Sequence, residues 1–135
     1  MANEPFTLDV VTLKQVVFSE PIASVTAPGS EGYFGILANH TPFVSSLQAG
    51  VIKIAKADGG ALTLATSGGF LMTDGKKVIL LADTAERPEE INVTRAQAAK
   101  ERAEKRLAER AADMDIDRAK AALFRAITRL KVAGR

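Results

Sequence analysis

The residues of this chain that could bind a ligand are arginines that recur at regular intervals near the C-terminus. Two sets share the spacing i, i+7, i+11, which places each set within about 40° on one side of a helix. The sets are Arg95, Arg102 and Arg106, and Arg118, Arg125 and Arg129. Two such stripes on adjacent helices could hold a phosphate or a carboxylate-rich segment, because guanidinium groups bind both in a bidentate manner.

Two other interpretations of the arginines stay open. They could form a solvated charged face with i,i+4 pairs such as Glu101–Lys105. Nucleic acid ranks last, because the net charge is only +2 and aromatic residues make up 5% of the chain. We therefore expect no nucleic-acid partner.

A second candidate for chemistry is the stretch GSEGYFGILANHTPF at residues 29–43, which contains three glycines and the only histidine, His40. The stretch lacks the Lys and Ser/Thr of a phosphate-binding P-loop, and no helical pattern follows it. A catalytic histidine needs a nucleophile and an orienting acid, but Ser45 and Ser46 have no acid close in sequence. We therefore expect His40 to lie in a Gly/Pro turn or an interface, and the chain not to be an enzyme.

The composition limits the remaining chemistry. Cysteine is absent, which excludes disulfides and thiol nucleophiles, and a single histidine argues against a metal site. The N-terminal MANEPFTLDVV lacks the pattern of a signal peptide, and no apolar run reaches the roughly 18 residues that span a bilayer. We therefore expect an intracellular protein that does not insert directly into a membrane.

The first part of the chain has the pattern of a β-sandwich or flattened barrel. It contains nine of the ten glycines and a series of short apolar runs separated by turn signals. ADGG at 57–60 and TDGKK at 73–77 each join two such runs, as expected for β-hairpins. The pattern predicts about nine short antiparallel strands.

From Pro88 onward the composition changes to Ala, Glu, Lys and Arg, which favour helices. A first helix is predicted from about 92 to 111, with Asn92 or Thr94 as its cap. The cluster ADMDID interrupts it, and one of its three aspartates can cap a second helix that ends near Val132. The short connector predicts an antiparallel helical hairpin.

The predicted contact between the two helices is weak. The seam residues are Ala96, Ala99, Ala103, Leu107 and Ala111 on the first helix, and Ile116, Ala119, Leu123, Ala126, Ile127 and Leu130 on the second. Burying a full leucine contributes roughly 1.5–3 kcal/mol, and an alanine methyl contributes far less. The hairpin could therefore dock on the sandwich, pack against a partner, or open, which suits a switch.

Three blocks of the sequence resemble the bacterial ATP synthase epsilon subunit family. GSEGYFGILANHTPFVSSLQAG is similar to its signature G-x-x-G-x-x-G-I-L-x-x-H-x-P, and SGGFLMTDGKKVILLADTAE is similar to its second block. RAQAAKERAEKRL and RAKAALFRAITRLKV look like its two C-terminal helices. The resemblance implies a β plus α fold, with a ten-stranded antiparallel β-sandwich in residues 1–86 and an antiparallel helical hairpin in residues 87–135.

The resemblance also implies a function. Members of this family are non-catalytic central-stalk subunits of the F-type ATP synthase, peripheral to the cytoplasmic face of the bacterial plasma membrane, and help couple proton-driven rotation to ATP synthesis. The sandwich would bind the gamma subunit, through His40 and Pro42, and the c-ring of the membrane sector. The helices would inhibit ATP hydrolysis when extended into the alpha and beta subunits, with Arg118, Arg125 and Arg129 against beta. The alternative is a free-standing β-sandwich module whose hairpin recruits an acidic partner.

Some family members bind ATP as a regulatory ligand that favours the folded-down hairpin, and no other cofactor is implied. Their motif I/L-D-x-x-R-A corresponds here to residues 91–96, INVTRA. The residues that the resemblance assigns to ATP are Glu86, Ile91, Asn92, Arg95, Ala96, Arg102, Arg125 and Arg129. Asn92 departs from the aspartate of the motif, and its amide accepts hydrogen bonds more weakly than a carboxylate. The change affects affinity more than fold, because Asn caps a helix nearly as well.

Overall fold

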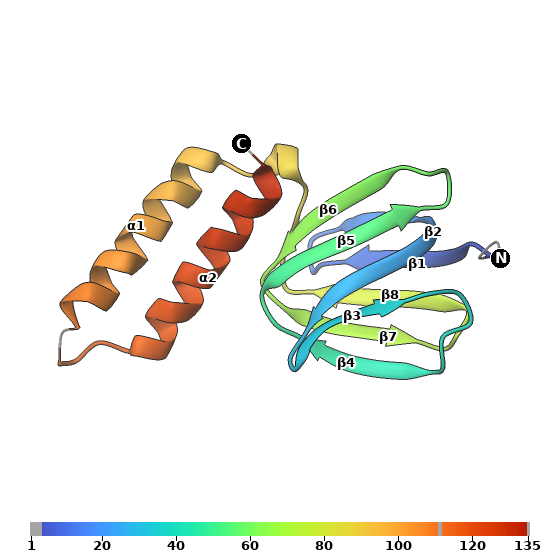
Figure 1. Cartoon of the computed structure of the whole chain (residues 1–135), viewed down its shortest axis with the longest axis horizontal. Helices are drawn as coiled ribbons and strands as arrows, with labels where there is room; N and C mark the ends of the chain where they lie inside the picture. The colour runs from blue at the N-terminus through green and yellow to red at the C-terminus, as the bar shows by residue number, and fades with distance from the viewer. Residues whose placement is uncertain (1–3, 111, 135) are drawn as a thin grey trace.

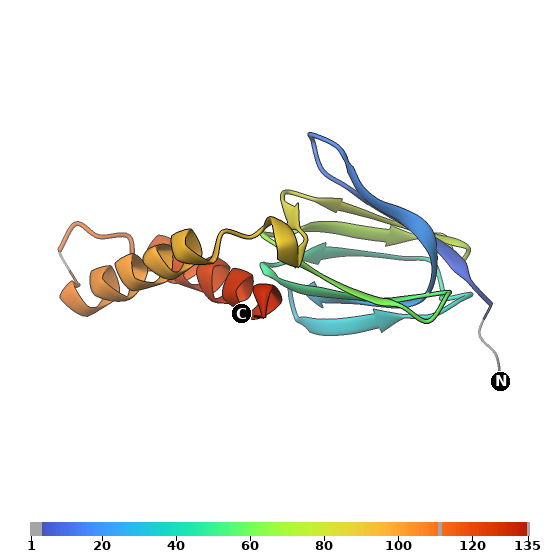
Figure 2. The ribbon, with the colours of Figure 1, turned by 90° about the horizontal axis from the view of Figure 1, so that it is seen from above.

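The computed structural model describes residues 4–110 and 112–134, which form a β-sandwich with a helical hairpin beside it (Figure 1). The strands are β1 (Phe6–Val11), β2 (Val16–Gly29), β3 (Gly32–Ile36), β4 (Phe43–Leu47), β5 (Gly50–Lys56), β6 (Ala61–Thr66), β7 (Gly69–Thr73), β8 (Lys77–Ala82) and β9 (Ala85–Glu86). The 3-10 turn η1 (Pro88–Glu90) leads into α1 (Val93–Glu109) and α2 (Ile116–Ala133). Figure 2 shows that the hairpin projects from one end of the sandwich and does not cover either layer. No helix of the described residues is long and apolar enough to cross a membrane.

The long strand β2 joins the two layers of the sandwich. The strand order is β1-β8-β7-β4-β2-β5-β6-β9, with β3 paired to β2 and an additional pairing of β1 with β2. The first half of β2 pairs with β1, and the second half pairs with β3 and β5. One strand therefore contributes to both layers and closes the sheet on itself.

The prediction of a sandwich followed by a helical hairpin is confirmed, with two differences in detail. The described residues form nine strands rather than ten, and β1 pairs with β8 in parallel rather than antiparallel fashion. Two of the short apolar runs in the sequence, QVVFSE and IASVTA, lie in the single strand β2, which continues through Pro21. The register shifts between Ile22 and Ser24, and this irregularity lets the strand bend from one layer to the other.

The core of the sandwich is almost entirely aliphatic, as the low aromatic content requires. Inward residues alternate with outward ones along β1 and β8, which is the period-2 pattern of a half-buried strand. The large side chains with less than 2% exposure include Leu8, Ile22, Ile36, Ile52, Leu64, Leu71 and Leu80. Each contributes roughly 1.5–3 kcal/mol by leaving water, so the sandwich is the stable part of the molecule.

Both helices begin at the caps that the sequence offers. The Asn92 side-chain oxygen accepts a hydrogen bond from the Arg95 amide at 3.0 Å, and Asp115 accepts one from the Arg118 amide at 3.0 Å. Gly134 ends α2 in the left-handed conformation, with φ of 64°. The predicted helix boundaries and the antiparallel hairpin agree with the structure to within two residues.

The seam between the helices differs from the prediction. The buried residues are the alanines Ala96, Ala103, Ala119 and Ala126, whereas Ile116 and Ile127 remain 41% and 42% exposed. The contact therefore follows the alanines of the predicted seam, and the two isoleucines lie to one side of it. Ala111, the last predicted seam residue of the first helix, lies outside the described residues.

The hairpin attaches to the sandwich through a small apolar cluster. Ile91, Val132 and Ala133 pack against Val51 of β5 and Ala65 of β6. These residues come from the end of α2 and the segment before α1, and Val93 at the start of α1 packs against them. The attachment is therefore separate from the main core and much smaller.

Candidate functional site

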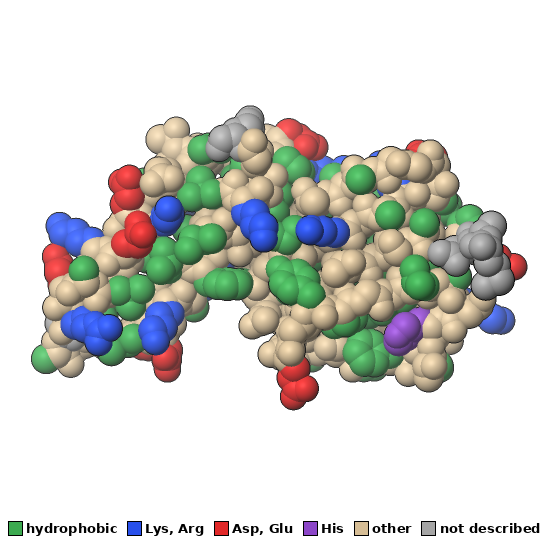
Figure 3. Space-filling model, in the orientation of Figure 1, with side chains coloured by type: hydrophobic (Ala, Val, Ile, Leu, Met, Phe, Trp, Pro, Cys, Tyr) green, Lys and Arg blue, Asp and Glu red, His purple; other side chains and the backbone are tan. Residues whose placement is uncertain are grey.

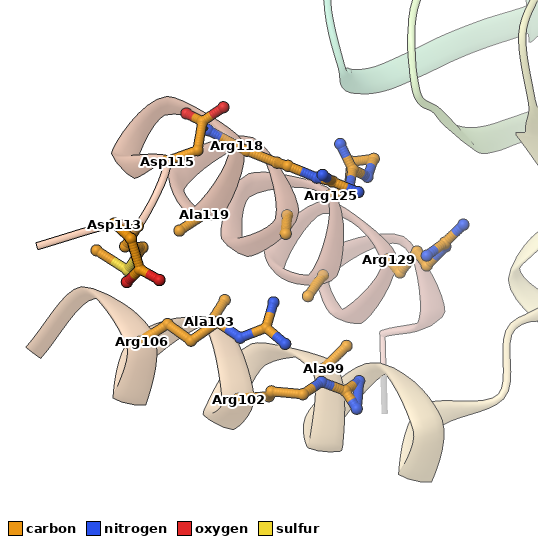
Figure 4. A pocket seen from close by; sticks show the side chains of 13 residues that line it. Ala99, Arg102, Ala103, Arg106, Asp113, Asp115, Arg118, Ala119, Arg125 and Arg129 are labelled. Atoms are coloured by element: carbon orange, nitrogen blue, oxygen red, sulfur yellow. The ribbon is translucent and has the colours of Figure 1, made fainter. Parts of the chain in front are cut away.

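A groove of about 780 Å³ lies between α1 and α2. Its floor consists of the small residues Ala99, Ala103, Ala119, Ala122 and Ala126. Five arginines line it, and we call it the arginine groove: Arg102 and Arg106 from α1, and Arg118, Arg125 and Arg129 from α2 (Figure 4). Asp113, Met114 and Asp115 of the connector close one end.

Helical spacing explains why the arginines meet. Each stripe lies on one side of its helix, and the antiparallel hairpin turns both stripes toward the same groove. Arg95, the first member of the α1 stripe, is exposed and does not line the groove. The i,i+4 partner of Lys105 is Glu109, at 4.0 Å, rather than the expected Glu101.

Most of the groove arginines have no counter-ion. Within the described part of the chain, the guanidinium groups of Arg102, Arg106, Arg118 and Arg125 form no hydrogen bond or ion pair. Arg129 differs, because its Nε donates to Glu86 Oε1 at 2.6 Å, and both side chains are about two-thirds buried. Four unpaired cations around one hollow create a positive potential that attracts anions.

The structure brings together only some of the residues expected to bind ATP. Arg102, Arg125 and Arg129 line the groove, and Glu86 reaches it through Arg129. The remaining four do not line it: Ile91, Asn92, Arg95 and Ala96. The side chains of Ile91 and Ala96 are buried, and the Asn92 oxygen caps α1.

Several residues of the groove are not among those that the family resemblance assigns to ATP. Arg106 belongs to the stripe of arginines on α1, one helical turn from Arg102, and this spacing is the sequence pattern that indicates its place in the groove. The sequence pattern predicted a helix cap among the connector residues but not a place in a binding site. Only the fold of the connector brings Asp113, Met114 and Asp115 to the groove. A second crevice of about 10 Å³ lies beside Glu86, between β6 and α2, and includes Thr66 and Thr128.

His40 lies at the end of the sandwich far from the hairpin, where it is the purple side chain of Figure 3. Its Nδ1 is 2.7 Å from the Thr41 carbonyl oxygen, and its ring packs edge-to-face on Phe43 at 5.6 Å. Pro42 is exposed in the same loop, just before β4. Among the described residues, no group of three or more His, Asp or Glu side chains could hold a metal ion.

The outer surface of one layer is unexpectedly apolar. In one row across the strands, Leu81 of β8 pairs with Val11 of β1 on one side and with Phe70 of β7 on the other. In the next row, Met72 of β7 pairs with Ile79 of β8 and with Val44 of β4. We call these six residues the apolar face. Phe70, Leu81 and Val44 are 54%, 44% and 67% exposed. Adjacent exposed apolar side chains of this kind mark an interaction surface.

A β-sandwich with an apolar outer face, joined to a hairpin that carries an arginine groove, defines a binding module. Residues 5–88 match the family model "ATP synthase, Delta/Epsilon chain, beta-sandwich domain". Residues 89–134 match the model "ATP synthase, Delta/Epsilon chain, long alpha-helix domain". The chain therefore belongs to the ATP synthase delta/epsilon chain family, as the sequence motifs predicted.

Similar chains are found in bacteria and in mitochondrial assemblies. The ATP synthase epsilon chain of Moorella thermoacetica is 50% identical over 127 residues, which cover 94% of this chain and 95% of that one. The ATP synthase epsilon chain of Pelotomaculum thermopropionicum is 48% identical over 135 residues, covering 100% of both. A chain of the Euglena gracilis mitochondrial ATP synthase (OSCP/F1/c-ring) has a TM-score of 0.81 at 24% identity, over 100% of this chain and 83% of that one, and shows the same fold.

Proposed function

We propose that this chain is a non-catalytic central-stalk subunit of an F-type ATP synthase that helps couple proton-driven rotation to ATP synthesis and regulates hydrolysis. Its partners are the gamma subunit, the c-ring, and the alpha and beta subunits when the hairpin extends. It works at the cytoplasmic face of the bacterial plasma membrane without inserting into it. Both domains of one family in their usual order, and relatives of the same length named epsilon chain, support this proposal.

The apolar face is the surface we assign to the gamma subunit. It is the outer side of β4, β7, β8 and β1, and the loop with His40 and Pro42 leads directly into β4. Apolar side chains on a rigid sheet provide a docking surface that needs no rearrangement. The double variant Val44→Ser, Phe70→Ser should lose co-purification with gamma, whereas Ile127→Ser on the hairpin should not. Retention of gamma by the double variant would assign the contact elsewhere.

The observation that carries the regulatory part of the proposal is the set of unpaired guanidinium groups in the arginine groove. The triphosphate of ATP would bind Arg102, Arg125 and Arg129 from both helices and hold them together. Ile91, Asn92, Arg95 and Ala96 lie at the start of α1, where the base would extend beyond the groove. The side chains of Ile91 and Ala96 are buried, and their amides already donate to the carbonyl oxygens of Pro88 and Asn92, so these two residues would position the start of α1 rather than contact the nucleotide.

The same arginines serve both conformations in this proposal. Arg118, Arg125 and Arg129 would contact an acidic segment of the beta subunit once the hairpin extends. A guanidinium group that holds a phosphate is not available to a carboxylate, so ATP and beta compete. ATP therefore favours the docked hairpin and relieves inhibition.

Calorimetric titration of the isolated chain with ATP tests the nucleotide site. We expect saturable heat that Arg125→Gln weakens about tenfold or more, while Lys105→Gln, an exposed cation outside the groove, has little effect. Truncation after Arg87 should raise ATP hydrolysis by the assembled complex without loss of gamma binding. Absence of heat at millimolar ATP would remove the nucleotide from the proposal, and unchanged hydrolysis would remove inhibition.

A further inference from the structure

The arginine groove extends beyond the residues that we assign to ATP. Arg102, Arg125 and Arg129 form one set near the sandwich, and Arg106 and Arg118 form a second set near the connector. Seven residues separate Arg118 from Arg125, which is about 10 Å along a helix axis. Arg106 lies one turn, about 6 Å, beyond Arg102, so the second set extends the line of arginines toward the connector.

The second set is not neutralised by the protein. Neither guanidinium group forms an ion pair or hydrogen bond within the described residues, although Asp113 and Asp115 line the same end of the groove. Oδ1 of Asp115 accepts a hydrogen bond from the Arg118 backbone amide, so this carboxylate already caps α2. Positive charges from both helices therefore line this end of the groove, where the nearby carboxylates of Asp113 and Asp115 pair with neither guanidinium group.

We propose that the arginine groove binds linear inorganic polyphosphate, in a chain long enough to contact both sets of arginines at once. Each unit of such a chain carries negative charge, and arginines project from both helices at intervals of one to two turns. The guanidinium fork matches phosphate oxygens in a bidentate manner. A chain that engages two sets gains from the second one without a further loss of translational freedom.

The floor of the groove favours a phosphate chain over an acidic peptide. It consists of alanine methyl groups, which offer no hydrogen-bonding partner. A peptide laid along it would present backbone N–H and C=O groups to these methyls, and each unsatisfied group costs free energy. A polyphosphate has no such groups, and its oxygens point toward the arginines on the walls.

The expected consequence is a second ligand that holds the hairpin in the docked form. A polyanion between α1 and α2 removes the repulsion among the five arginines and bridges the two helices. This inference depends on the geometry of the groove and not on ATP binding. The two ligands should nevertheless exclude each other, because both need Arg102, Arg125 and Arg129.

The test is calorimetry on the full chain with sodium tripolyphosphate and with a longer linear polyphosphate, at equal ionic strength and with sodium sulfate as an ion control. We expect the longer chain to bind about tenfold or more tightly than tripolyphosphate. The double variant Arg106→Gln, Arg118→Gln should cancel this advantage and leave tripolyphosphate and ATP affinities within about twofold. The matched control Lys105→Gln, Lys120→Gln removes two charges from the same helices outside the groove and should retain the advantage.

Three outcomes would overturn the inference. Equal affinity for the two chain lengths, an equal loss in the lysine control, or, if ATP itself binds, failure of excess ATP to displace the longer chain would each do so. ATP binding together with no advantage of the longer chain would leave the proposed function intact. Polyphosphate binding without ATP binding would support the inference and refute the nucleotide site.

Discussion

Ile91→Ala should release the hairpin from the sandwich without unfolding the sandwich. Ile91 is 4% exposed and lies at the centre of the cluster that joins the two parts, beside Val132 and Ala133. It immediately precedes the cap of α1, so its contacts fix where the first helix begins. None of the sandwich core residues depends on it.

The magnitude follows from the atoms removed. The substitution deletes three buried carbons, each worth about 0.8 kcal/mol, for a total of about 2.4 kcal/mol. The other strong contact between the parts, the Glu86–Arg129 ion pair, is about one-third exposed and adds at most about 1 kcal/mol. The docked state therefore loses a large share of its stability, and the docking equilibrium should shift about fiftyfold.

Amide hydrogen exchange of the full chain measures this shift. Amides in α1 and α2 should exchange much faster in the variant, because the alanine seam holds the undocked helices only weakly, while β-strand amides should be unchanged. Ile127→Ala is the matched control, since it removes the same atoms from a residue that is 42% exposed. Equal acceleration in strands and helices, or no acceleration in the helices, would refute the reasoning.

Three further predictions concern stability and are measured by chemical or thermal unfolding. Gly69→Ala should lower the free energy of unfolding by about 3 kcal/mol or more, because the φ of Gly69 is +143° and an added Cβ would lie 2.0 Å from a β8 carbonyl oxygen. The control Gly59→Ala, which has open space around it, should lower the free energy of unfolding by about 1 kcal/mol. The Ser19 hydroxyl donates a hydrogen bond to Asp9 and lowers the pKa of this carboxyl group, so the carboxylate stabilises the fold at neutral pH. This contribution to stability should decrease as the pH drops below about 3.8, and it should be absent from the variant Asp9→Asn. Asp115→Ala should lower stability by about 1 kcal/mol through loss of the α2 cap, with reduced helical circular dichroism.

Local sequence signals predicted the elements of this fold well. ADGG and TDGKK do connect β5 to β6 and β7 to β8, because Gly59 and Gly75 adopt the positive φ that these turns need. Asn92 and Asp115 do cap the helices, since their side chains reach amides only three residues away. Such contacts depend on neighbours in the chain, so a short window of sequence contains all the information.

Contacts between distant residues were not predictable in this way. Pro21 separates the apolar runs QVVFSE and IASVTA, yet β2 continues through it because pairing with β1 holds the chain extended. The parallel pairing of β1 with β8 joins residues about seventy positions apart, and no local pattern encodes it. The apolar face likewise exists only because this register aligns residues from four strands.

The candidate site likewise has features that the sequence alone determined and features that depend on tertiary structure. The sequence determined that arginines occupy one side of each helix, because helical periodicity alone fixes that. It also predicted a helix contact poor in apolar surface, since alanine has little surface to bury. Tertiary structure decided which arginines share a groove, that Glu86 neutralises Arg129, and that Arg87 anchors the linker by donating to the Val17 carbonyl at 2.7 Å. These depend on how the hairpin folds back and docks, and that arrangement is set by packing between segments that the sequence keeps far apart.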